Sequence, residues 1–503
     1  MVREGMVITV LTTALKFVGF AREWLLAYFF GAGVLVDAYR ITNSIVIMVK
    51  TFLFGHHNEN AMVPLVNGWR SRNNPRCAAG LLRSLAALFL FVSLLAFAVM
   101  LFAAPWIVHV QAPDFTGEQE RLTILLLRWI TPALPLYAAA TFLGYLLATV
   151  HRFRLFAMIP AFINLGSLAS IVAVGVFDAP VFLLAVGYWT GIGLGTILLA
   201  LEAARFKPDR IRLTFQRAGR FLAPFLVNIW PLLLLSLLFQ VRLFVDNRIA
   251  SSLSIGAVAV LGYARFVIQT PFSTAGLAIV RLVLPRFSEM TASGRDLEIG
   301  RQYEKIIDAA LWLILPFVAV TIVGAEQLIE LIFGYGRFDD EAVQMTAWAM
   351  VGAAPSLWSR IIFPIGSRIF NAQRRNISLM GIYFVSVGLG IAAAILLSRR
   401  IGVAGITMGT VVSEFLLVIG MVWFVPGVRR GRTYRSILLW WGLTVGLVFV
   451  LRAIPTMGPA IAQLILFTVI AGALWILVSF LLPSGRRSLA LVREVFQRLV
   501  KGS

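Results

Sequence analysis

Long apolar runs, separated by short clusters of glycine, proline and charged residues, set the pattern of this chain. A helix needs about 20 predominantly apolar residues to cross a bilayer. The runs have this length, and together they predict fourteen membrane-spanning helices. Their predicted limits are residues 6–30, 34–66, 77–110, 119–150, 155–177, 180–204, 219–248, 254–285, 302–334, 342–371, 376–398, 401–426, 435–453 and 460–482.

The composition agrees with this pattern. Of the 503 residues, 60% are hydrophobic and 13% are charged, whereas an ordinary soluble domain is about 45–50% apolar and about 25% charged. These values exclude a soluble enzyme, a disordered chain and a fibrous protein, and they indicate an all-α polytopic membrane protein. The N-terminal segment runs into the first apolar stretch without a small-residue cleavage site, so we expect a retained helix rather than a signal peptide.

The formal net charge of +21 comes from 44 Lys and Arg residues against 23 acids. In a soluble protein this excess would suggest nucleic acid, but in a membrane protein it indicates cytoplasmic loops and anionic lipids. Loops that follow even-numbered spans carry 20 basic residues, and the alternate loops carry 6. Both termini are therefore expected in the cytoplasm of a bacterial inner membrane, with anionic lipids and no nucleic acid as partners.

The chain divides into two similar halves that share features at an offset of 220 residues. Pro135 in the first half and Pro355 in the second occupy corresponding positions, as expected of the parallel repeats found in transporters. The resulting layout is two six-helix lobes plus a C-terminal helix pair. We expect an N-lobe at 1–204, a cytoplasmic linker at 205–220, a C-lobe at 221–427, two further spans at 428–483 and a basic amphipathic tail at 484–503.

Charged residues inside the spans are the main candidates for function, because each costs at least about 2.5–3.5 kcal/mol at the centre of a membrane helix. Most are basic, so a cationic cavity between the lobes is our hypothesis, and guanidinium groups suit a diphosphate. The charged positions in the spans are Lys16, Arg22, Glu23, Asp37, Arg40, Lys50, Arg242, Asp246, Arg265, Arg281, Arg360, Arg368 and Glu414.

Local pairing is the alternative explanation of these charges. Arg22 or Lys16 could pair with Glu23, Arg40 with Asp37, and Arg242 with Asp246 one helical turn away. The second span also contains a polar break, residues 56–60, with His56, Asn58 and Glu59. This break could read the hydroxyl groups of a sugar or could simply cap a bent helix. Its spacing matches no known metal-ligand pattern, the single cysteine excludes a multi-cysteine site, and no metal is expected.

Several short motifs, taken in order, resemble the MurJ/MviN family of lipid II flippases in the MOP exporter superfamily. The likeness runs from about residue 10 to 425. The motifs that carry it begin with Gly19-Phe20-Ala21-Arg22-Glu23, Phe30-Gly31-Ala32-Gly33 and Asp37-Ala38, and continue with His151-Arg152-Phe153, Val245-Asp246-Asn247-Arg248, Leu284-Pro285-Arg286-Phe287-Ser288, Phe333-Gly334-Tyr335-Gly336-Arg337-Phe338 and Arg368-Ile369-Phe370-Asn371.

The resemblance implies fourteen helices, alternating access and flipping of an undecaprenyl-diphosphate-linked saccharide to the outer leaflet. The family's cavity residues carry over at Arg22 and Asp37, and as lysine at Lys16 and Lys50. The eighth-span arginine and glutamate of the family fall on Phe266 and Gln269, with Arg265 one position before Phe266. These departures keep open a relative that flips an exopolysaccharide repeat unit on the same lipid carrier.

A cation-coupled small-molecule antiporter of the same superfamily is a further alternative, which the excess of basic residues disfavours. No nucleotide-binding motif is present, so a transporter without a cofactor is expected, driven by a coupling ion or by the membrane potential. Asp246 and Glu414 are the acids best placed to bind such an ion. We expect a monomer whose partner is the polyprenyl-diphosphate glycolipid, and we predict a transporter rather than an enzyme.

Overall fold

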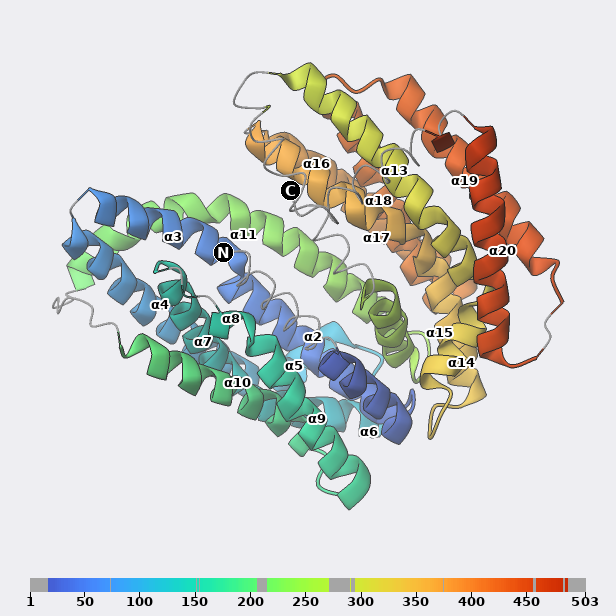
Figure 1. Cartoon of the computed structure of the whole chain (residues 1–503). Helices are drawn as coiled ribbons and strands as arrows, with labels where there is room; N and C mark the ends of the chain where they lie inside the picture. The colour runs from blue at the N-terminus through green and yellow to red at the C-terminus, as the bar shows by residue number, and fades with distance from the viewer. Residues whose placement is uncertain are drawn as a thin grey trace. The chain divides into compact units, whose positions relative to one another are not determined.

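A computed structural model describes residues 17–72, 74–150, 152, 154–205, 215–270, 290, 295–373, 375–455, 458–482 and 485–486. These residues form helices joined by short turns, and no strand occurs among them. The chain divides into two compact units, Met1–Ala259 and Val260–Ser503. Figure 1 shows the helices of the first unit from blue to green and those of the second from yellow to red.

The first unit begins with a helix over residues 17–30 and continues through ten labelled helices (Figure 1). Their bounds are α2 Val34–Phe54, α3 His56–Ser71, α4 Pro75–Phe102, α5 Ala104–Gln111, α6 Gly117–Ile130, α7 Ala133–Ala148, α8 Arg154–Ala157, α9 Ile159–Phe177, α10 Leu183–Ala203 and α11 Phe215–Ser251. Helix α11, the seventh predicted span, packs on α2, α3 and α4 and so belongs to this compact unit. The lobe limits expected from span number stay a prediction.

The second unit follows an apolar helix at Ala257–Thr270 whose first residues belong to the first unit. Its bounds are α13 Asp296–Val323, α14 Ala325–Phe333, α15 Asp340–Ala353, the 3₁₀ helix η1 Ala354–Trp358, α16 Ser359–Ala372, α17 Asn376–Ile401, α18 Val403–Phe424, α19 Arg430–Arg452 and α20 Ala460–Leu481. The predicted basic tail beyond residue 486 and most of the predicted linker lie outside the described residues.

Each of the fourteen predicted spans overlaps a described helix or two or three consecutive helices, and the predicted stretches 6–16 and 271–285 lie outside the described residues. Within the described residues, eight helices are long and apolar enough to cross a membrane, or nine if the bent pair α6 and α7 is one span. Helix α2 fails that test because it carries three charged residues, Asp37, Arg40 and Lys50. The predicted all-α polytopic architecture is therefore confirmed.

Helix breaks recur at corresponding places in the two units. In the first unit α4 is interrupted before α5, and in the second α13 is interrupted before α14, with starts of the shorter helices 221 residues apart. Helices α10 and α18 begin 220 residues apart. The offset expected from the sequence therefore also describes the order and spacing of the helices, as in an internal duplication.

Glycines fix the packing of α9 against α10, which lie side by side in Figure 1. Gly187, Gly191 and Gly195 recur every four residues on the face of α10 that contacts α9. A Cβ atom on Gly191 would lie 2.2 Å from the carbonyl oxygen of Phe162. Small residues at this spacing allow the helix backbones to approach closely within a membrane, and so they set the rotation of α10.

The second predicted span breaks at Gly55, between α2 and α3. A Cβ atom there would lie 2.4 Å from the carbonyl oxygen of Thr51, so glycine is required for close approach. The hydroxyl of Tyr145 on α7 donates to the carbonyls of Phe54 and Gly55 at 3.1 and 2.9 Å. The amide of Asn58 donates to the carbonyls of Leu53 and Gly55. Because unsatisfied carbonyls are costly in an apolar interior, these donors stabilise the bend.

A tryptophan of α20 hydrogen-bonds the carbonyl that a proline inside α13 leaves without a partner. Pro316 has no N–H group, so the carbonyl of Trp312 one turn earlier loses its partner within the helix. The indole N–H of Trp475 donates to that carbonyl at 2.8 Å, and the indole N–H of Trp312 donates to Ser479 at 2.6 Å. These two hydrogen bonds attach α20 to α13.

Two glycines of α10 provide a matched test of this packing. Gly191→Ala should lower the thermal stability of the detergent-solubilised protein, because its methyl group would overlap the backbone of α9. Gly193→Ala meets its nearest atom, in the side chain of Leu136, only at 3.8 Å. It should be neutral or stabilising by up to about 1 kcal/mol through helix propensity. Thermal unfolding followed by tryptophan fluorescence compares the two, and equal effects would show that close packing does not decide stability here.

Candidate functional site

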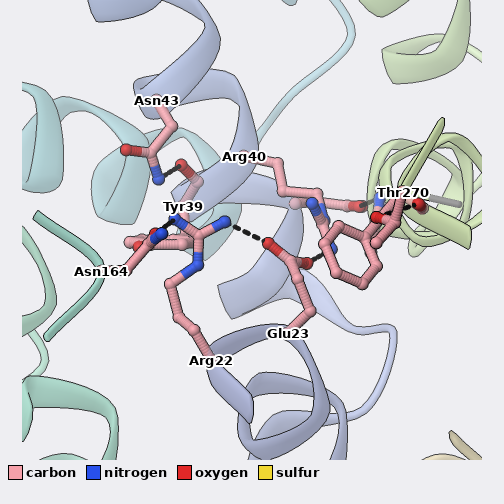
Figure 2. Close-up of polar contacts among 10 residues, drawn as sticks. Arg22, Glu23, Tyr39, Arg40, Asn43, Asn164 and Thr270 are labelled. Atoms are coloured by element: carbon pink, nitrogen blue, oxygen red, sulfur yellow. Dashed lines mark hydrogen bonds and ion pairs between the residues drawn. The ribbon is translucent and has the colours of Figure 1, made fainter. Parts of the chain in front are cut away.

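A cluster of two arginines and one glutamate lies in the interior of the first unit. Figure 2 shows the Glu23 carboxylate between the guanidinium groups of Arg22 and Arg40. Arg22 pairs with one carboxylate oxygen, and Arg40 lies 2.7 Å from the other. Arg22 also donates to the side-chain oxygen of Asn164 on α9 at 2.9 Å.

A helical hairpin brings these residues together. Gly31, which adopts a left-handed φ of 62°, forms the turn between the helix 17–30 and α2. Glu23 lies eight residues before Gly31 and Arg40 nine residues after it, so the two side chains meet across the hairpin. Gly19, one turn before Glu23, leaves room for Asn164, whose amide nitrogen would lie 3.4 Å from a Cβ atom at that position.

The two guanidinium groups of the cluster share one carboxylate and stay partly exposed. The single carboxylate of Glu23 is shared by two guanidinium groups, and its side chain is only 5% exposed. The side chain of Arg22 is 25% exposed and that of Arg40 is 15% exposed. Each guanidinium has five N–H donors in a planar fork that matches phosphate oxygens. The arrangement can therefore hold an oriented, partly accessible cation for an anionic group.

Lys50 is held by aromatic side chains from two other helices of the same unit. Its ammonium donates to the hydroxyl of Tyr188 on α10 at 2.9 Å. It also lies over the rings of Tyr137 and Tyr188, 4.7 and 5.6 Å from their centres, within the range of cation–π interactions. These contacts hold the charge in place without neutralising it.

Asp37 makes a different kind of contact. Its buried carboxylate accepts hydrogen bonds from the backbone N–H groups of Gly256 and Ala259 at 2.6 and 2.8 Å, and from the side chain of Gln119 at 3.0 Å. The two amides lie at the start of the helix Ala257–Thr270, where N–H groups lack helical partners and favour a negative charge. Asp37 therefore caps this helix.

The described side-chain hydrogen bonds of His56, Asn58 and Glu59 are made within residues 53–59 and do not involve the arginine cluster. His56 and Glu59 form an exposed ion pair with 3.3 Å between Nδ1 and Oε2. Asn58 is buried and donates to two backbone carbonyls, which favours the helix-capping interpretation over sugar recognition. The described residues contain no group of three or more His, Cys, Asp or Glu side chains placed to hold a metal ion.

The remaining candidates are distributed over both units. In the first, Arg242 pairs with Asp246 one turn away at 2.9 Å, as the local-pairing alternative expected. In the second, Glu414 on α18 accepts a hydrogen bond from Ser359 and lies 3.8 Å from Arg360. Arg265 is half-buried and Gln269 is exposed, both on the helix 257–270. Lys16 lies outside the described residues.

Five residues of the site were not among the predicted binding residues: Glu23, Gln119, Tyr137, Asn164 and Tyr188. Glu23 was considered only as a local partner of Arg22 or Lys16, and the structure adds its contact with Arg40. Asn164 and Tyr188 are neutral residues within apolar spans. An amide in the middle of an apolar span is a sequence signal that points to Asn164, whereas a tyrosine in a span is ordinary.

Comparison with solved structures defines the fold. A structure of the lipid II flippase MurJ in an inward closed conformation matches with a TM-score of 0.76 at 16% sequence identity, covering 93% of this chain and 98% of that one. An inward-facing multidrug resistance MATE family transporter of the MOP superfamily matches with a TM-score of 0.67 at 14% identity, covering 84% and 96%. The fold is that of the polytopic transporters of this superfamily.

Sequence comparison then gives the family. The model of the family described as lipid II flippase MurJ matches residues 26–483, and the chain belongs to this family. A probable lipid II flippase MurJ of Rhizobium meliloti is 25% identical over 445 residues, covering 85% of this chain and 81% of the relative. The lipid II flippase MurJ of Burkholderia cenocepacia is 24% identical over 421 residues, covering 80% of each.

The capping role of Asp37 can be tested without a transport assay. Asp37→Asn replaces an acceptor-only carboxylate by an amide that carries two donors, facing groups that are themselves donors. The amides of Gly256 and Ala259 should then exchange faster in hydrogen–deuterium exchange of peptides covering residues 254–262. Asp339→Asn is the matched control, because Asp339 caps a different helix, α15, by accepting from Ala342 at 2.9 Å. It should leave exchange over 254–262 unchanged. Unchanged exchange over 254–262 in Asp37→Asn would show that the cap contributes nothing.

Proposed function

We propose that this protein moves an undecaprenyl-diphosphate-linked saccharide, the peptidoglycan precursor lipid II, from the cytoplasmic to the outer leaflet by alternating access. Membership of the lipid II flippase family supports the substrate class. The excess of basic residues in the loops after even-numbered spans supports cytoplasmic termini in a bacterial inner membrane. The direction is the one that the resemblance to this family implies.

The observation that carries this proposal is the shared carboxylate of Glu23. It holds two partly exposed guanidinium groups inside a membrane protein, where charged side chains are costly and mark substrate pathways. A diphosphate suits these groups, since its oxygens accept paired N–H donors from arginine. Asn164 and Glu23 hold Arg22 in a fixed orientation for this contact.

Two alternatives differ in their predictions. A flippase for an exopolysaccharide repeat unit would use the same diphosphate contacts and differ at the sugar, and the residues Phe266 and Gln269 are the sequence departures that favour it. A cation-coupled antiporter would need an acidic site, whereas the arginine cluster is basic.

The membrane potential favours outward movement of an anion, by about 2.3 kcal/mol per charge and 100 mV. Asp246 and Glu414 stay candidates for ion coupling.

Complementation distinguishes the two flippases. The chain should restore growth to a bacterial strain depleted of its own lipid II flippase. A strain that lacks its exopolysaccharide repeat-unit flippase should not recover polymer export when this chain is expressed. The reverse pattern would replace lipid II by a polysaccharide repeat unit as the substrate. No rescue of either strain, with the protein present in the membrane, would contradict the proposed function.

Variants of the cluster test whether geometry or total charge matters. Arg22→Ala should abolish rescue and Arg22→Lys should restore little, because a single ammonium cannot make two parallel hydrogen bonds. Glu23→Gln increases the net positive charge, so charge alone predicts stronger anion binding. We expect instead a loss of rescue, because the two arginines lose the carboxylate that orients them.

The control for these variants is Arg128→Ala, which removes an exposed arginine of α6 in the same unit. It should rescue as well as the wild type. Protein amount in the membrane is measured for every variant by immunoblot. Full rescue by Glu23→Gln at equal protein amount would show that the orientation of Arg22 and Arg40 is irrelevant to transport.

A further inference from the structure

Helix α16 of the second unit has one apolar face and one polar face. It packs on α13, α17 and α18, and its buried side chains include Ile361, Ile362, Ile365, Ile369 and Phe370. The opposite side of the helix carries the half-buried Arg360 and Ser367 and the exposed Arg368 and Asn371. Because α16 belongs to the tenth predicted span, residues 342–371, this polar face lies within a membrane-crossing segment.

The two arginines of this face differ in their partners. Arg360 lies 3.8 Å from Glu414 on α18, and its side chain is 29% exposed. Arg368 forms no ion pair and no side-chain hydrogen bond with any residue that the structure describes. Snorkelling to the membrane surface would accommodate Arg368 near the end of the span, but not Arg360, which lies eight residues deeper. Exposed charges at that depth mark a water-filled path or a substrate site.

Contacts at the start of α16 hold Arg360 in place. The hydroxyl of Ser359 donates to the carboxylate of Glu414. The residues next to this pair, Trp358 and Phe415, pack ring against ring with 4.9 Å between their centres. Glu414 is therefore fixed beside the guanidinium of Arg360, which has five N–H donors and keeps several of them for a second acceptor.

The spacing of the two arginines limits the ligand. Eight residues of α-helix place their Cα atoms about 12 Å apart on one side of α16. This arrangement suits two separate anionic groups on an extended chain better than the adjoining phosphates of one diphosphate. An extended peptide covers about 12 Å in about four residues. The peptide of lipid II has this form, with a carboxylate at its end and others along its length.

We propose that the polar face of α16 binds carboxylates of the peptide of lipid II, with one held by Arg360, one held by Arg368, and Glu414 as the positioning residue for Arg360. This inference rests on the proposed function and deepens it, because it names the part of the substrate that the second unit recognises. A polysaccharide repeat unit without carboxylates would leave both guanidinium groups without an anion, so the same face disfavours that substrate.

The test uses the full chain in detergent and measures apparent affinities by native mass spectrometry. The three ligands are lipid II, lipid II with its peptide carboxylates amidated, and the same lipid-linked disaccharide without a peptide. The wild type should bind lipid II most tightly. Arg368→Gln and Arg360→Gln should each lower affinity for lipid II about tenfold, which corresponds to about 1.4 kcal/mol, and leave the other two ligands unchanged. Arg400→Gln is the matched control, because it removes an exposed arginine at the end of α17 in the same unit.

Glu414→Gln tests the positioning role, because it keeps the shape of the side chain and removes the charge beside Arg360. It should lower the preference for lipid II over the peptide-free ligand about threefold, as expected when a charged hydrogen-bonding group loses its orientation but stays present. Thr407→Val is the control on the same helix. The hydroxyl of Thr407 binds the backbone carbonyl of Ala349, so this variant should lower thermal stability and leave the preference unchanged.

Three outcomes would overturn the inference. Equal losses for lipid II and the peptide-free ligand in the arginine variants would show that α16 does not recognise the peptide. Unchanged affinity in both arginine variants would leave these residues with no role in binding. Equal binding of lipid II and its amidated form by the wild type would show that carboxylates are not the groups recognised. A wild type that prefers lipid II over both other ligands but fails complementation would instead contradict the proposed function and leave this site intact.

Discussion

One carboxylate shared between two arginines is the interaction on which the interior of the first unit depends. Glu23 allows Arg22 and Arg40 to be placed inside a membrane protein, where an isolated guanidinium would be prohibitively costly. The carboxylate also orients the two guanidinium groups, which stay partly exposed. One interaction therefore makes the two cations tolerable in the membrane and fixes their direction.

The two units share a helix order but differ in what they enclose. In the first, charged and hydrogen-bonding side chains gather around the helical hairpin and α10. In the second, the aromatic side chains of Trp358, Phe415 and Trp441 pack together, with ring centres 4.9 to 6.2 Å apart, close to the Glu414 and Arg360 pair. The first half thus gathers the arginine cluster and Lys50, whereas this part of the second half combines an aromatic cluster with one ion pair. The side chains differ between the halves, while the break between α4 and α5 corresponds to the break between α13 and α14.

The sequence predicted the helices well because a span is defined by a local property, its uninterrupted apolar length. It also identified the charged residues of the site, since a charge in a span is conspicuous. The pairing between them was harder to predict. Local spacing suggested Asp37 as the partner of Arg40, whereas the structure adds a contact with Glu23 across a turn and engages Asp37 with backbone amides. Contacts between helices depend on their rotation, which glycine packing sets and single-sequence patterns do not reveal.

The hydrogen bond from Trp475 to the carbonyl freed by Pro316 has a consequence for how this protein can evolve. Pro316 in α13 and Trp475 in α20 depend on each other. Without α20 the carbonyl of Trp312 would have no hydrogen-bond partner in hydrocarbon, at a cost of several kcal/mol. A shortened chain without α20 should therefore be better tolerated when Pro316 is replaced as well, so a change at one of the two positions alters what the other can accept.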